Sequence, residues 1–75
     1  MITDNKFINL LYDAKPKING TRVVIDTGYN NSRMYIYYDS LNEVYVFFDL
    51  YIDNIKLVPT NKQLQITTEY INRCK

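Results

Sequence analysis

Residues 33–52, RMYIYYDSLNEVYVFFDLYI, decide the fold of this chain. The stretch is rich in β-branched and aromatic residues that repeat with a period of two, which is typical of β-strands. We therefore expect strands over 33–39 and 43–52, joined by a tight turn. In the second strand the even positions 44–52 are all Val, Phe, Leu or Ile, so this side is predicted to face the core.

Register arguments favour a three-residue turn, Ser40-Leu41-Asn42, between these two strands. Asp39 then lies opposite Glu43, and Ile36 meets Val46 on the core side, whereas a shift by one residue would break the apolar face. Such a turn needs a left-handed residue at its end, which Asn tolerates better than other non-Gly residues.

The opposite face of the same pair is predicted to carry aromatic and acidic side chains. Tyr37 would lie beside Tyr45 and Tyr35 beside Phe47, and cross-strand aromatic pairs stabilise a sheet locally. We expect this face to hold the binding residues, which are Tyr35, Tyr37, Tyr45, Phe47, Asp49, Tyr51 and Asp53.

Two further strands are expected at 21–27 and 55–58. Asp53-Asn54 suits a two-residue hairpin turn that aligns Ile52 with Ile55. The first hairpin is clear as a turn at 28–32, but its register is open, because either Val24 or the pair Val23 and Ile25 could face the core.

Helices are expected at both ends of the chain. Residues 3–14 place Phe7, Leu10, Leu11 and Ala14 on one stripe, after an N-cap at Thr3 and before Pro16. Thr60-Asn61-Lys62-Gln63 has the form of a capping box, which favours a helix over 61–73. The alternative for 61–73 is a fifth strand, because Leu, Ile, Thr and Tyr alternate at 64–70.

Length and composition indicate one small α+β domain spanning residues 1–75, with an N-terminal helix, a four-stranded antiparallel meander and a C-terminal helix packed on one sheet face. A chain of 75 residues builds one modest core, and 47% hydrophobic residues are typical of a globular protein. We expect no secretory signal or membrane span, and the lone Cys74 favours a reducing cytoplasm.

Catalysis is the weakest functional class for this sequence. The chain contains no His, so it lacks the side chain that changes charge near neutral pH and that activates nucleophiles. Asp49 and Asp53 would stand roughly 13 Å apart along one strand, too far to share a cation. We therefore expect no enzyme activity, no cofactor and no metal.

Charge is unevenly distributed along the chain. Residues 1–33 hold five basic and three acidic side chains, residues 34–53 hold four acidic and none basic, and residues 54–75 hold four basic and one acidic. Seven of the eleven aromatics lie in the acidic segment, and a negative field repels phosphates. Nucleic-acid binding at the aromatic face is therefore disfavoured.

The sequence thus predicts a small non-enzymatic protein-binding module. Its acidic tyrosine-rich face would select a partner with a basic surface, such as a nuclease or DNA-binding protein. An inhibitor encoded by a phage or mobile element, comparable in size and character to anti-CRISPR proteins, fits this description. The alternative function is a nucleic-acid-binding accessory protein that uses its basic ends. A further alternative is that the C-terminal segment, or a second copy in a homodimer, covers the tyrosines.

Overall fold

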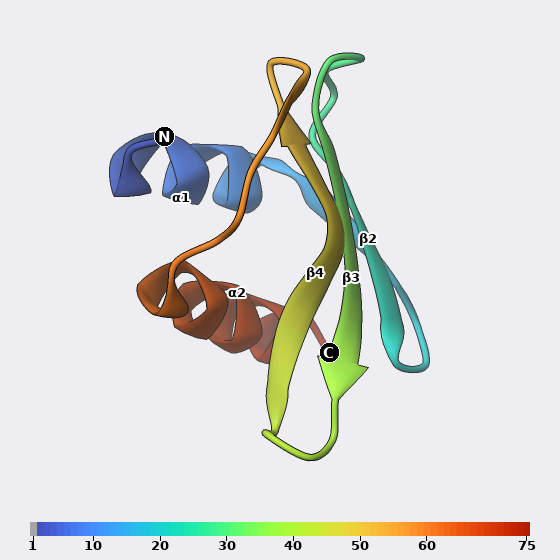
Figure 1. Cartoon of the computed structure of the whole chain (residues 1–75). Helices are drawn as coiled ribbons and strands as arrows, with labels where there is room; N and C mark the ends of the chain where they lie inside the picture. The colour runs from blue at the N-terminus through green and yellow to red at the C-terminus, as the bar shows by residue number, and fades with distance from the viewer. Residues whose placement is uncertain (1) are drawn as a thin grey trace.

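The computed structural model describes residues 2–75 and contains two helices and one antiparallel sheet. The elements are α1 (Asp4–Asp13), β1 (Lys15–Asn19), β2 (Arg22–Asp26), β3 (Arg33–Asp39), β4 (Val44–Ile52), β5 (Ile55–Lys56) and α2 (Asn61–Cys74). The strands follow one another in spatial order β1-β2-β3-β4-β5. Both helices lie on the same side of the sheet (Figure 1). The α+β prediction is confirmed.

The first helix begins and ends where the sequence predicts. The Thr3 side chain accepts a hydrogen bond from the Lys6 amide at 3.2 Å, and Phe7 and Leu11 are fully buried against the sheet. After Ala14 the chain is extended, because the ring of Pro16 disfavours helical backbone at Lys15.

Strand β1 was not among the expected strands. Its sequence, KPKIN, is mostly polar and contains a proline, so it carries no clear strand pattern. An edge strand tolerates both features, because one side of it needs no hydrogen-bonding partner. Gly20, at φ 63°, turns the chain back so that Asn19 pairs with Arg22.

The register between β3 and β4 differs from the prediction. Ile36 lies opposite Phe47 instead of Val46, and the left-handed turn residue is Glu43, at φ 57°, instead of Asn42. A β-bulge then adds Phe48 as an extra residue before Asp49 pairs with Tyr35. The longer turn and the bulge each shift β4 by one residue in the same direction, so beyond residue 48 the pairing differs from the prediction by two residues while the even positions face the core again.

The bulge divides β4 into two halves that face the core with opposite parity. Before it, Tyr45 and Phe47 point toward the helices; after it, Leu50 and Ile52 do so, as predicted. Phe48 is left on the far face with 52% of its surface exposed. The prediction that Phe48 belongs to the core, and Tyr45 and Phe47 to the opposite face, is therefore wrong.

The neighbouring hairpins agree with the sequence. Ile52 pairs with Ile55 through a turn in which Asp53 and Asn54 both have positive φ. In β2 the buried residues are Val23 and Ile25, which resolves the open register of the first hairpin.

The segment after Pro59 is the helix α2, as the capping box predicts. Thr60 and Gln63 exchange side-chain and backbone hydrogen bonds at 3.1 Å, and Ile71 is fully buried. The helix also covers the free edge of β4, where the Thr68 hydroxyl accepts a hydrogen bond from the Tyr45 amide. The fold thus buries the centre of one face of the sheet, while no other element of residues 2–75 covers the opposite face (Figure 1).

Candidate functional site

The uncovered face of the sheet is built from three cross-strand rows, because residues paired directly across antiparallel strands point to the same side. We call this surface the open face. Its rows are Lys17, Val24, Tyr35 and Asp49; Asn19, Arg22, Tyr37 and Val46; and Arg33, Tyr51 and Lys56. Phe48, the bulged residue, joins the first two rows on β4.

Aromatic rings form the centre of the open face. Phe48 packs beside Tyr35, with ring centroids 5.9 Å apart and planes at 18°, and beside Tyr37, with centroids 6.0 Å apart. Tyr37 is 42% exposed. Exposed rings of this size are uncommon on the free surface of a monomer when they adjoin, so this cluster marks a candidate contact region.

Each row of the open face also contains a basic residue. Lys17 shares a row with Tyr35, Arg22 lies opposite Tyr37, and Tyr51 has Arg33 on one side and Lys56 on the other. The Arg22 guanidinium carbon is 5.9 Å from the Phe48 ring centroid, and that of Arg33 is 4.4 Å from the Tyr51 centroid. Basic side chains therefore lie on more than one side of the aromatic cluster.

The carboxylates on this side are already engaged. Asp49, the only acid in the three rows, lies 3.6 Å from Arg33. Asp26 accepts a hydrogen bond from the Gly28 amide, and at the end of β3 the side-chain amide of Asn42 holds the pKa of Asp39 below its ordinary value. In contrast, Lys17, Arg22 and Lys56 form no ion pair with any of residues 2–75. Asp26 and Asp39 keep their negative charge, but Lys15 adds a cation in the row of Asp26, so cations still outnumber carboxylates on this side of the sheet.

Four of the seven predicted site residues lie together on the open face: Tyr35, Tyr37, Asp49 and Tyr51. Tyr45 is 1% exposed in the core, and Phe47 packs edge-on against Phe7 with centroids 6.0 Å apart. Asp53 lies in the β4–β5 turn and binds Lys6 of α1 at 2.7 Å. These last three residues are not part of the open face.

Sequence reasoning placed none of Lys17, Arg22 and Lys56 beside the tyrosines, and it assigned Phe48 to the core. The doublet Phe47-Phe48 interrupts strict alternation and was the available signal for a bulge. Lys17 was not assigned to a strand, because β1 was not predicted from the sequence. Arg22 belonged to a strand whose register was open.

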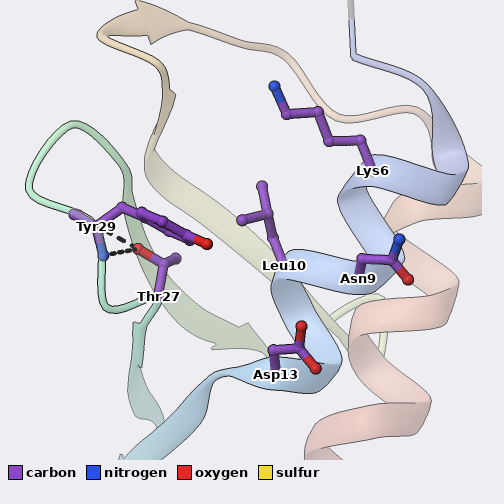
Figure 2. A pocket seen from close by; sticks show the side chains of 6 residues that line it. All are labelled: Lys6, Asn9, Leu10, Asp13, Thr27 and Tyr29. Carbon is purple, nitrogen blue, oxygen red and sulfur yellow. Dashed lines mark hydrogen bonds between the residues drawn. The ribbon is translucent and has the colours of Figure 1, made fainter.

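A hollow of about 370 Å³ lies on another part of the molecule, between α1 and the β2–β3 loop. Figure 2 shows Leu10 and Tyr29 pointing toward each other across it, with Asp13 at one end. Lys6 also lines it but is bound to Asp53, and the Thr27 hydroxyl accepts from the Tyr29 amide. The lining therefore brings together no nucleophile and base.

The interior offers no second site among the described residues. Every buried side-chain nitrogen and oxygen within 2–75 has a hydrogen-bonding partner, and no three potential metal ligands gather there. Burial raises the pKa of Tyr70, whose hydroxyl donates to the Ala14 carbonyl, so this group is structural. Cys74 is a free, exposed thiol.

The chain matches no family model, and no curated protein or solved structure matches it either. Within residues 2–75 neither helix has the length and apolar character needed to cross a membrane.

Proposed function

We propose that this chain is a small, non-enzymatic nucleic-acid-binding accessory protein and that the open face is its binding surface. The observation that carries the proposal is the presence of a basic residue in every aromatic row, three of them without an ion-pair partner. Lys and Arg beside exposed rings supply the two interactions that nucleic acids accept from a sheet surface, phosphate contacts and stacking.

This proposal replaces the basic termini with the open face as the binding surface. The negative field inferred from residues 34–53 arises only when those residues are considered alone. In the sheet, β1, β2 and β5 bring Lys17, Arg22 and Lys56 beside them, while Asp53 is turned toward α1. The three rows hold four cations and one carboxylate, and the flanking rows add Lys15, Asp26 and Asp39, so cations outnumber carboxylates on this side of the sheet by five to three.

Arg22→Gln tests the proposal, with Arg73→Gln as the matched control. Both arginines stand about 6 Å from an aromatic ring, but Arg73 lies over Tyr12 on the helical side. We expect wild-type protein to bind nucleic acid with an affinity that falls as salt rises. Arg22→Gln should weaken binding and reduce the slope of log affinity against log salt by about 1. Absence of binding at low salt, or equal effects of both variants, contradicts the proposal.

A protein partner is the second candidate function, and the composition of the cluster favours it. Phe48, Tyr37 and Arg22 are residue types enriched where protein interfaces carry most of their binding energy. A cytoplasmic inhibitor encoded by a phage or mobile element, with anti-CRISPR-like action, remains the setting proposed for this candidate. Because its unpaired charges are basic, the open face would complement an acidic partner surface. Nuclease-resistant capture of one host protein, lost with Phe48→Asp, would favour this candidate over the first.

A further inference from the structure

A continuous group of three rings crosses β3 and β4 on the open face. Tyr35, Phe48 and Tyr37 are linked by centroid distances of 5.9 and 6.0 Å, with Phe48 in the middle. Phe48 reaches this position only because the β-bulge turns it away from the core. Bulges commonly re-aim a side chain beside a binding site.

From this geometry we infer that the nucleic acid bound here is single-stranded. The inference rests on the proposed function and adds the strand type to it. Unpaired bases stack on the rings of Tyr35, Phe48 and Tyr37, as every base presents a π-face. The backbone phosphates then contact the basic residues next to these rings, Lys17 and Arg22.

The shape of the open face also favours single strands over a duplex. Duplex bases are read by a helix or a two-stranded ribbon that enters a groove. Here both helices are on the opposite side of the sheet (Figure 1), and the rings lie on β3 and β4, where the sheet is four strands wide. A four-stranded surface is broader than the two-stranded ribbon that the major groove of B-form DNA admits, whereas splayed bases can lie on it.

Charge complementarity supports the same ligand. The Arg22 guanidinium carbon lies over the Phe48 ring, 5.9 Å from its centroid, and has no acidic partner, so a base that displaces it from this ring leaves it to pair with the adjacent phosphate. Arg33 is paired with Asp49 and lies over Tyr51, so it is engaged within the protein and is not assigned a phosphate contact. A single-stranded nucleic acid has a phosphate and an aromatic base in each nucleotide, which matches the neighbouring basic and aromatic side chains of the open face.

The test compares a fluorescent thymine oligonucleotide of about 15 nucleotides with a duplex of the same length, since small sheet modules occupy sites of roughly 4–16 nucleotides. We expect tighter binding of the single strand at equal salt. Phe48→Leu, which keeps apolar bulk but removes the ring, should weaken single-strand binding about 5- to 100-fold. Tyr29→Leu is the matched control, because Tyr29 is 63% exposed in the β2–β3 loop, away from the open face. It should bind like wild type.

Several results would overturn the inference, and they separate it from the proposed function. If single strand and duplex bind equally and Arg22→Gln weakens both, the protein binds nucleic acid but not by base stacking. The proposed function then stands and the single-strand inference fails. If Phe48→Leu and a second ring variant, Tyr37→Leu, both bind the single strand like wild type, the rings do not stack bases and the single-strand inference again fails. No salt-dependent binding of either probe overturns both proposals. A wild-type dimer that Phe48→Leu converts to monomer, detected by sedimentation, shows that a second copy occupies the face and also overturns them.

Discussion

Phe47 and Phe48 are adjacent and chemically identical, yet their surroundings are opposite. Phe47 packs on Phe7 beneath the helices, whereas Phe48 lies among tyrosines on the uncovered side with half of its surface exposed. Phe48 is only half buried, so its ring contributes less to the stability of the fold than a core ring does. The position is therefore free to serve binding.

Truncation of Tyr45 and of Phe48 should have very different effects on stability. Tyr45 is 1% exposed in the core, and removing a large buried ring costs about 3–5 kcal/mol of the free energy of unfolding. Phe48→Ala removes a half-buried ring and its contacts with Tyr35 and Tyr37, so it should cost only about 1 kcal/mol. Urea unfolding of both variants measures the difference. A greater loss for Phe48→Ala would mean that the bulge is misplaced and that the strict alternation predicted for β4 holds.

At the scale of elements, the ends of the helices are determined by a few polar side chains. Thr60 caps α2 through the Gln63 amide, and the Gln63 side chain reaches back to the Thr60 amide and across to Asp4 of α1. The capping box therefore also joins the two helices that cover the sheet.

Removing this cap should lower stability without changing the fold. We expect Thr60→Ala to reduce the free energy of unfolding by about 1 kcal/mol, since it leaves the Gln63 amide without its partner. Thr60→Ser retains the hydroxyl and should stay close to wild type. Chemical denaturation of the two variants checks the prediction, and equal loss in both would argue against capping as the cause.

Elements governed by local rules were the ones predictable from sequence. Both helices follow from caps and apolar spacing, and the β4–β5 turn follows from Asp53-Asn54. The register of β3 and β4 did not follow, because residues 44–48 are apolar on both faces and alternation alone cannot choose between them. β1 was missed for the opposite reason, since it has little apolar pattern and is held by pairing with β2.

For the molecule as a whole, the distribution of charge in space differs from its distribution along the chain. The acidic segment 34–53 forms only two strands of the sheet, and its neighbours come from the basic segments on both sides. Tyr35, Tyr37, Asp49 and Tyr51 were placed on one face correctly, but the sign of the charge around them depends on pairing with Lys17, Arg22 and Lys56. Strand pairing brings together residues that are distant in the sequence, so charges counted over separate segments do not predict it.

The central claim, that the open face is the binding surface, is tested most directly by amide chemical-shift mapping. Uniformly ¹⁵N-labelled protein would be titrated with the unlabelled thymine oligonucleotide at low salt. The account predicts that the largest shifts fall on Arg22–Asp26, Arg33–Asp39 and Val44–Ile52, centred on Phe48. Shifts concentrated on the exposed sides of α1 and α2, or no shifts at all, would contradict it.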